Sequence, residues 1–386
     1  MYMERGRGSH VWDVDGNEYV DYVMAYGPFL LGYACEEVDG AAIAQLRKGP
    51  LLSLNHPLHL EFVEALLPRL PGAEMAIFLK TGSEATTAAV RVARRYTGRR
   101  RVARAGYHGW HDWCLPTEAF VPSGLESQVE EFRADDPESL TRCLEAAPGE
   151  FAAVIVAPEM ICPPSRDTFA RLAEIARAHG AVFIADEVKT AFRTRPGSVQ
   201  AHLGVTADLT TVSKALGNGW PIAAVTGRRA ILEAAAGMHV SATFHGDTAA
   251  MAAALATLRI LDRESVQDRV WRLGERLIAG LGEAARALDL PAVAFGEPFP
   301  PMPFLRFTDP DEATNERIKR RFYEEMFRRG ILLHPRHMWF ISHAHSEDDI
   351  DRTIEAAHAA MRVAREGDLL HDDASTARGE RGNVSM

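Results

Sequence analysis

Short apolar runs and longer segments of helical periodicity alternate through the middle of the chain. Six runs predict strands, at 75–79, 101–105, 152–157, 181–185, 209–212 and 223–226. Helical patterns predict helices over 84–96, 168–179 and 247–261, the second of them capped by Gly180. The runs 152–157 and 181–185 contain no charged residue, which is typical of strands buried on both faces. The alternation predicts an α/β fold with a mostly parallel sheet covered by helices.

The two ends of the chain have a different pattern. Alternating segments around Asp15 and Gly16 predict a hairpin-like start. After a proline-rich break at 298–303, the pattern predicts a strand at 304–307, a helix at 311–329, a short strand and a last helix at 348–365. The organisation predicted is 1–45 as the N-terminal part of a small domain, 46–285 as a large domain, 286–365 as the C-terminal part of the small domain, and 366–386 as a disordered tail without apolar periodicity.

Composition and charge narrow the class of protein. The 386 residues are 47% hydrophobic and 25% charged, as in soluble globular proteins with a large core. The net charge of −10 argues against a general affinity for nucleic acid or anionic membranes. We see no apolar stretch long enough for a membrane span and no N-terminal leader pattern. The four scattered cysteines, Cys35, Cys114, Cys143 and Cys162, predict reduced thiols in a cytoplasmic protein.

Two charged residues interrupt apolar segments. Lys214 follows the run 209–212 in a chain that has only four other lysines, Lys48, Lys80, Lys189 and Lys319. Desolvation lowers the pKa of a lysine and makes its amine nucleophilic towards an aldehyde, although a lysine at a strand end also occurs without any such role. Asp186 ends the run 181–185, where ligands of open α/β sheets bind. A buried carboxylate needs a cationic partner such as a protonated pyridine nitrogen, or it caps a helix.

Three further patterns offer binding groups. Gly82 and Ser83 open a helix whose free amides and dipole favour an anion, although Thr81 and Glu84 also fit an ordinary capping box. In YHGWHDW at 107–113, Tyr107 or His108 has the ring needed to stack on a flat cofactor, although clustered aromatics most often pack in a core. The remaining histidines have no firm metal-ligand spacing, so we expect no metal site.

Together these segments resemble the class III pyridoxal-phosphate-dependent aminotransferases, in particular the glutamate-1-semialdehyde aminomutase-like branch. TGSEA resembles the family's SGTEA, DEVKTAFR resembles DEVMTGFR, and VSKALGNGWPIAAVTG resembles the segment with the cofactor lysine. VWDVDGNEYVDY near the start and SHAHSEDDIDRTIEAA near the end also match. The resemblance implies the PLP fold type I architecture: a large domain with a mostly parallel seven-stranded sheet, and a smaller α/β domain made from both chain ends.

The same resemblance implies roles for particular residues. Lys214 is implied to hold pyridoxal 5′-phosphate (PLP) as a Schiff base and to shuttle protons, and Asp186 to bind the pyridine nitrogen. The other cofactor contacts implied are Val188 on one ring face, Tyr107 or His108 on the other, Gly82 and Ser83 at the phosphate, and Thr243 at the phosphate of the neighbouring subunit. The Thr243 contact implies a homodimer with shared active sites.

Departures from the family pattern concern the substrate. The candidate substrate contacts are Arg5, Trp12, Glu159, Lys189, His337 and Trp339. The loop after Tyr107, towards 131–135, is shorter than the lid of aminomutases, and the segment HPRHMWFIS lacks their glutamate. We therefore expect an aminotransferase that moves an amino group from a donor amine to a carbonyl acceptor, in a specialised biosynthetic pathway. The alternatives are an aminomutase and, further away, a non-catalytic protein with the same fold.

Overall fold

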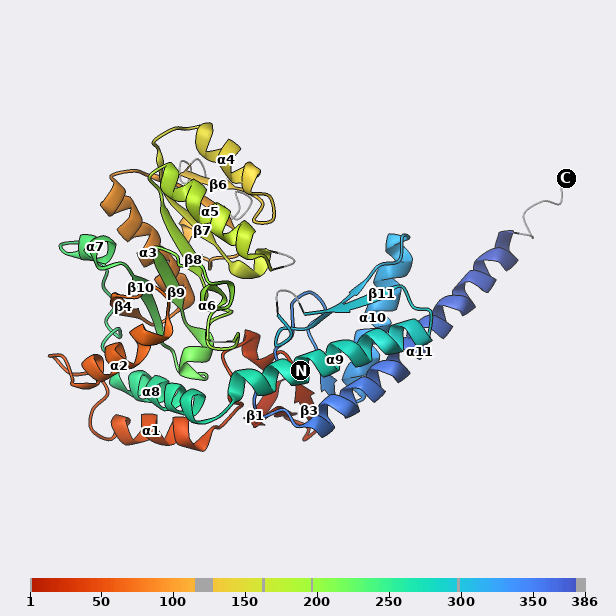
Figure 1. Ribbon diagram of the computed structural model, residues 1–386. Helices are drawn as coiled ribbons and strands as arrows, with labels where there is room; N and C mark the ends of the chain where they lie inside the picture. The colour runs from red at the N-terminus through yellow and green to blue at the C-terminus, as the bar shows by residue number, and fades with distance from the viewer. Residues whose placement is uncertain (1, 115–127, 162–163, 196, 297–298, 380–386) are drawn as a thin grey trace. The chain divides into compact units, whose positions relative to one another are not determined.

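The computed structural model of the chain divides into two compact units (Figure 1). It describes residues 2–114, 128–161, 164–195, 197–296 and 299–379. The large unit comprises Gly27–Leu31 and Cys35–Asp268, and the small unit comprises Met1–Tyr26, Gly32–Ala34 and Arg269–Met386. Compared with the predicted domains, residues 27–31 and 35–45, expected in the small domain, fall in the large unit, and residues 269–285, expected in the large domain, fall in the small unit.

A seven-stranded sheet forms the centre of the large unit, in the order β4-β10-β9-β8-β7-β5-β6. Its strands are β4 (Met75–Leu79), β5 (Arg101–Ala105), β6 (Val129–Glu131), β7 (Phe151–Val156), β8 (Val182–Asp186), β9 (Leu209–Val212) and β10 (Ala223–Gly227). The pairs from β6 to β9 are parallel, whereas β10 is antiparallel to both β9 and β4. The sheet is therefore mostly parallel, as the alternating pattern predicted.

Helices cover both faces of this sheet. On β8, Val182 and Ile184 pack in one cluster with α3 (Gly82–Thr97), while Phe183 points to the opposite face and contacts Phe169 of α5 (Arg166–Ala178). The other helices of this unit are α1 (Glu36–Leu46), α2 (Leu58–Leu66), α4 (Pro137–Glu145), α6 (Val199–Leu203), α7 (Arg229–Leu232) and α8 (Thr248–Arg263). α1 packs along α8, which explains why it belongs to the large unit (Figure 1).

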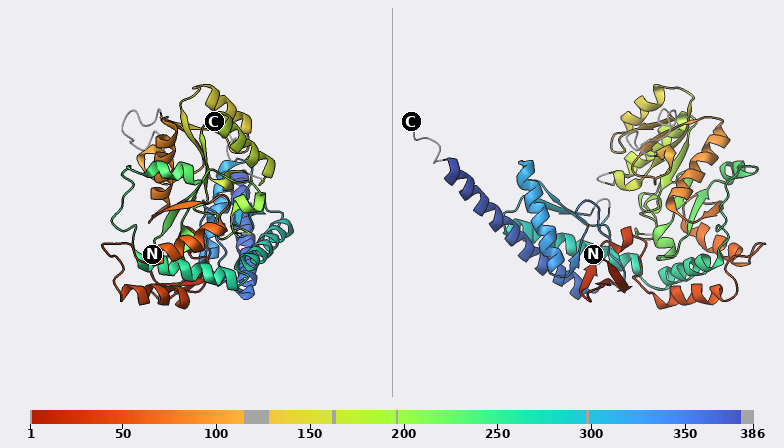
Figure 2. Two further views of the ribbon diagram at one scale, coloured as in Figure 1. Left: turned by 60° about the vertical axis from the view of Figure 1, so that its left-hand side comes forward. Right: turned by 180° about the vertical axis from the view of Figure 1, so that it is seen from behind.

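The described residues of the small unit form two sheets and three long helices. Its first sheet has the order β1-β2-β3-β13, and β11 pairs with β12 in the second. The strands are β1 (Met3–Arg7), β2 (His10–Asp13), β3 (Glu18–Asp21), β11 (Ala292–Phe295), β12 (Phe304–Phe307) and β13 (Ile331–Leu332). α9 (Val266–Ala287) enters this unit at Arg269. α10 (Glu312–Arg328) packs along α11 (Glu347–Gly379), and these two are the blue helices of Figure 2.

Most predicted elements are present, and their bounds differ by few residues. The strands predicted at 75–79, 101–105 and 209–212 have the predicted bounds, and the hairpin start is the antiparallel pair β2–β3. The elements of the described residues that were not predicted include the strands β6 and β11 and the helices α1, α2, α4, α6, α7 and α9. α11 continues to Gly379, into the segment predicted to be a disordered tail, while 380–386 lie outside the described residues. No helix of the described part of the chain is long and apolar enough to cross a membrane.

Candidate active site

Asp186 lies at the carboxyl end of β8, where the register of the sheet surrounds it with donors. Its Oδ1 accepts hydrogen bonds from Thr211 Oγ1 at 2.8 Å and from the Val188 amide at 3.2 Å. Its Oδ2 lies 2.7 Å from Nδ1 of His108, which follows β5. Asp186 is only 4% exposed and His108 only 1%. Hydrogen bonds from three residues therefore hold a buried carboxylate in one orientation at the ligand-binding edge of the sheet.

Lys214 follows β9, the neighbour of β8, and begins a 3₁₀ turn that runs to Gly217. Its backbone has a φ of +46°, in the left-handed region that side chains other than glycine rarely adopt. Burial lowers the pKa of the Lys214 amine to about 8, and the charge of Lys189 acts in the same direction. A lysine in this state has a substantial fraction of free amine near neutral pH, which a nucleophile requires.

The N-terminus of α3 provides open backbone donors. Thr81 and Glu84 form a complete capping box, in which each side chain accepts a hydrogen bond from the backbone amide of the other residue. Within the described residues, the amides of Gly82 and Ser83 have no acceptor. A β-carbon at Gly82 would lie 2.7 Å from Cγ1 of Val188, so this position requires glycine. The arrangement leaves two amides and the positive end of a helix for an anion.

Two predicted cofactor contacts lie on the surface of the large unit. Tyr107 is 69% exposed, directly before the buried His108. Thr243 is exposed in a turn that precedes α8, and Asp247, the N-cap of that helix, pairs with Lys80 at 2.9 Å. Thr243 makes no hydrogen bond to the described residues of its own chain. Both side chains are thus exposed on this unit rather than packed in its core.

Glu159 and Lys189 form an ion pair at the same edge of the sheet. Lys189 Nζ lies 2.7 Å from Glu159 Oε1, and the two side chains are 15% and 5% exposed. Glu159 belongs to the turn after β7, and Lys189 to the turn after β8. The second carboxylate oxygen of Glu159 is buried and has no hydrogen-bond partner among the described residues. The sequence had suggested both residues as substrate contacts, and the structure shows that they contact each other.

The other candidate substrate residues belong to the small unit. The guanidinium of Arg5 lies over the ring of Trp12, 3.7 Å from its centroid. His337 lies edge-on to Tyr26, at 5.3 Å between ring centroids. Trp339 is fully buried, and its Nε1 donates to the carbonyl of His334 at 2.9 Å. These contacts give Trp339 a place in the core of the small unit, where it packs rather than meets solvent.

Sequence reasoning missed the residues that support Asp186. Thr211 was counted only as part of a strand, and His108 was considered for stacking rather than for a hydrogen bond to a carboxylate. Glu187 is fully buried and accepts hydrogen bonds from Thr190, from the amides of Val199 and Gln200, and from the Gln200 side chain. Burial raises the pKa of Glu187, although these hydrogen bonds act in the opposite direction. Its contacts tie the turn after β8 to α6, so it supports the site from behind.

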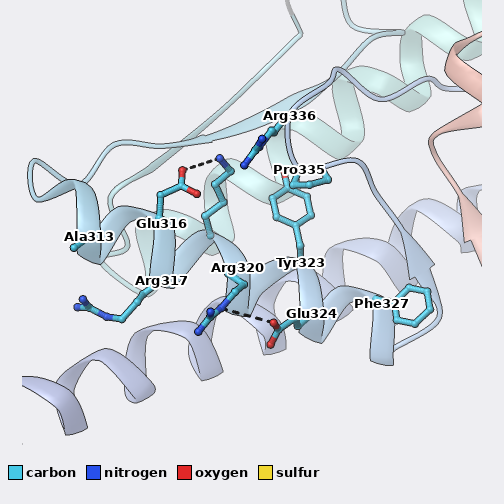
Figure 3. Close-up of a pocket in the computed structure, with 10 residues that line it drawn as sticks. Ala313, Glu316, Arg317, Arg320, Tyr323, Glu324, Phe327, Pro335 and Arg336 are labelled. Carbon is cyan, nitrogen blue, oxygen red and sulfur yellow. Dashed lines mark hydrogen bonds and ion pairs between the residues drawn. The ribbon is translucent and has the colours of Figure 1, made fainter. Parts of the chain in front are cut away.

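A hollow of about 630 Å³ on α10 contains none of these predicted site residues (Figure 3). Its walls carry charged side chains that mostly pair along the same helix, Lys319 with Glu316 at 2.9 Å and Arg320 with Glu324 at 3.8 Å. Paired, partly exposed charges of this kind are typical of a solvated helix face. Among the described residues, no group of three or more histidines, cysteines or carboxylates is placed to hold a metal ion.

The amino-acid sequence is similar to a known protein family and to characterised members of it. The family model of class-III aminotransferases matches residues 1–293. The chain is 34% identical over 369 residues to 3-aminobutyryl-CoA aminotransferase of Cloacimonas acidaminovorans, which covers 94% of this chain and 89% of that protein. It is 33% identical over 390 residues to glutamate-1-semialdehyde 2,1-aminomutase of Archaeoglobus fulgidus, covering 94% and 92% of the two chains.

A solved structure agrees with these sequence relatives. The FumI protein of Sphingopyxis sp. MTA144, in its PLP internal aldimine form, superimposes with a TM-score of 0.88 at 30% sequence identity. The match covers 97% of this chain and 90% of that one. The residues of the present site suit PLP: a buried carboxylate for the ring, open amides for the phosphate, and a lysine of lowered pKa for the aldehyde.

Proposed function

The chain belongs to the class-III aminotransferases, which use PLP, and we propose that Lys214 binds this cofactor covalently. The observation that carries the proposal is the half-buried, largely desolvated amine of Lys214, which follows β9, next to β8 and its buried carboxylate Asp186. An amine must be uncharged to attack an aldehyde. With its pKa lowered from 10.5 to about 8, Lys214 has on the order of 10² times more free amine at neutral pH than an ordinary lysine.

The other residues of the edge hold and orient the cofactor in this proposal. Gly82 and Ser83 bind the phosphate through their amides, and Asp186 places its charge opposite the ring nitrogen. His108 and Thr211 keep that carboxylate in place. When bound, PLP supplies an electron-withdrawing ring for reactions at the carbon that carries the amino group. Lys214 Nζ would then take the proton from that carbon and deliver it to the cofactor carbon that carried the aldehyde, and would run the same transfer in reverse when the acceptor is aminated.

The reaction that we propose is transfer of an amino group from a donor amine to a separate carbonyl acceptor. The relatives include an aminotransferase at 34% identity and an aminomutase at 33%. Sequence identity alone therefore does not distinguish the two reactions. The short lid that favours the aminotransferase falls largely on residues 115–127, which lie outside the described residues. The first donors to test are β-amino compounds, because the relative at 34% identity is named for 3-aminobutyryl-CoA.

We also propose a homodimer that works in the cytoplasm in a specialised biosynthetic pathway. The exposed Thr243 has no bonding partner in the described part of its own chain and suits a phosphate of the neighbouring subunit. The described cysteines, Cys35, Cys114 and Cys143, are free thiols, in agreement with a reducing compartment. Arg5 and Trp12, which contact each other, remain the proposed substrate contacts in the small unit, with His337. Trp339 is removed from that set, because it is fully buried in the core of the unit.

A donor and acceptor screen tests the function. Purified protein with PLP receives 3-aminobutyrate, its thioester and other primary amines, each with pyruvate or 2-oxoglutarate, and formation of alanine or glutamate is measured. We expect product only when both partners are present, and none with Lys214→Ala. Formation of an isomer from glutamate-1-semialdehyde alone, without a second carbonyl compound, would instead assign the chain to the aminomutases.

A further inference from the structure

The ion pair of Lys189 with Glu159 joins two turns at the edge that carries Asp186 and Lys214. Glu159 follows β7 and Lys189 follows β8, and these parallel strands are direct neighbours. The carboxyl ends of parallel neighbours lie at one edge of a sheet. The 2.7 Å contact between Lys189 Nζ and Glu159 Oε1 therefore lies at the same edge as the end of β9, which Lys214 follows.

Stability gives little reason for this pair. Two largely buried charges lose hydration, and their attraction rarely returns more than that loss. Here the loss is larger than usual, because Glu159 Oε2 is buried without a partner among the described residues. Two apolar side chains of similar volume would suit the fold at least as well. A charged pair in this position therefore requires another explanation than the folding of the large unit.

The charges around Lys214 supply that explanation. Four groups act on its amine besides burial: Lys189 and Arg193 disfavour the charged form, while Glu159 and Asp186 favour it. Lys189 has the strongest influence of the four, and Glu159 the next. Arg193 is fixed by hydrogen bonds to the carbonyls of Lys189 and Gly27, and Asp186 is fixed by His108 and Thr211. Lys189 and Glu159 are thus the two strongest charges, held against each other.

We propose that Lys189 and Glu159 are a pair of positioning residues that sets the charge state of Lys214. The Lys189 ammonium adds to the effect of burial and increases the fraction of Lys214 amine that is uncharged and able to accept a proton. The Glu159 carboxylate holds Lys189 in place and limits its effect. This role rests on the proposed function, in which Lys214 is the cofactor lysine. It assigns opposite effects to two residues that contact each other, which a purely structural role does not.

Single substitutions should move the charge state of Lys214 in opposite directions. Glu159→Gln leaves the Lys189 ammonium uncompensated, so the pKa of Lys214 falls. Lys189→Met removes the repelling charge and leaves a carboxylate, so the pKa of Lys214 rises. We expect each change to be about one pH unit, which is the order of magnitude for one neighbouring charge. The neutral double variant Glu159→Gln/Lys189→Met removes both charges and should return close to the wild type.

Trace acetylation of the cofactor-free protein measures these values without any turnover. Acetic anhydride labels uncharged amines, and mass spectrometry follows the Lys214 peptide from pH 6 to pH 11. Lys48, which is exposed, reports an ordinary lysine in the same molecule and should not respond to any variant. Lys189→Arg, which keeps the charge, is the matched control and should leave the midpoint of Lys214 unchanged. Circular dichroism verifies that each variant is folded.

The outcomes separate this proposal from the proposed function. Opposite movements of the Lys214 midpoint support the positioning pair. Midpoints that stay in place, or that move in the same direction in both single variants, overturn it. If the single variants do not fold, the double variant alone decides. A change of about one pH unit in its Lys214 midpoint overturns the proposal, because this variant removes one positive and one negative charge and so leaves the net charge unchanged. Borohydride reduction of the loaded wild type then tests the function alone: cofactor trapped on Lys214 upholds it, whatever the variants show.

Discussion

Replacing Asp186 with asparagine isolates the effect of its charge from the effect of its shape. The side chain accepts two hydrogen bonds at Oδ1, and Oδ2 faces Nδ1 of His108. An asparagine oxygen at the Oδ1 position keeps the bonds from Thr211 and Val188. Its amide nitrogen then donates to Nδ1 of a neutral His108. The fold should therefore survive, and what is lost is one negative charge at a site that is 4% exposed.

The expected loss follows from comparable charge-stabilising groups. Removing such a group raises the barrier by about 3–5 kcal/mol, which corresponds to a decrease of roughly 10²–10⁴-fold in turnover. Thr211→Val is the matched comparison, because it keeps the charge and removes one buried hydrogen bond to it. That bond contributes about 1.5–3 kcal/mol, so the loss should be smaller, between roughly tenfold and 150-fold.

Single-turnover kinetics with a saturating amine donor provide the assay, because they exclude release of product. The cofactor spectrum is followed after mixing, and bound PLP is quantified so that activity is given per loaded site. If Asp186→Asn turns over within tenfold of the wild type, or loses no more than Thr211→Val, the charge is not what Asp186 contributes. The role assigned to it here would then be wrong.

Four further predictions concern cofactor binding. Lys214→Ala should abolish covalent attachment of PLP, and borohydride trapping of the cofactor on Lys189 instead would contradict the assignment. In the wild type, the rate of covalent attachment to the cofactor-free protein should rise with pH and level off above a midpoint near 8, since only the uncharged Lys214 amine reacts; stopped-flow absorbance measures it. Gly82→Ala should displace Val188, whose Cγ1 would lie 2.7 Å from the new β-carbon, and PLP should dissociate faster in dialysis. Thr243→Val should weaken PLP retention, and dilution of the wild type should release cofactor as the subunits separate. A protein that is monomeric by analytical ultracentrifugation and fully active in the transfer assay refutes the shared site.

The sequence predicted the parallel strands well because burial on both faces leaves an unmistakable apolar run. β7 and β8, the strand of Asp186, are of this kind. β6 has the sequence VEE and lies at the edge of the sheet. Its conformation follows from backbone pairing with β5 and not from an apolar pattern of its own. No local signal marks such a strand.

The same distinction holds for the site. Lys214 and Asp186 stood out because charged residues are rare beside buried strands. Thr211 did not, because threonine is common in strands. Its contact with Asp186 arises only from the register of β8 against β9, which pairs these two residues directly. His108 contacts Asp186 although β7 lies between their strands. Strand order and register are properties of the whole sheet, so a sequence read segment by segment does not contain them.

The antiparallel strand β10 also determines when the site is completed during protein synthesis. β4, which leads directly into Gly82, has β10 as its neighbour in the sheet, in the order β4-β10-β9. The ribosome therefore produces Met75–Leu79 long before Ala223–Gly227, the segment against which it pairs. At ordinary translation rates the delay is on the order of ten seconds. During that interval the N-terminal end of α3 has no fixed place relative to Lys214, so the nascent chain does not yet hold together the residues proposed to bind the cofactor.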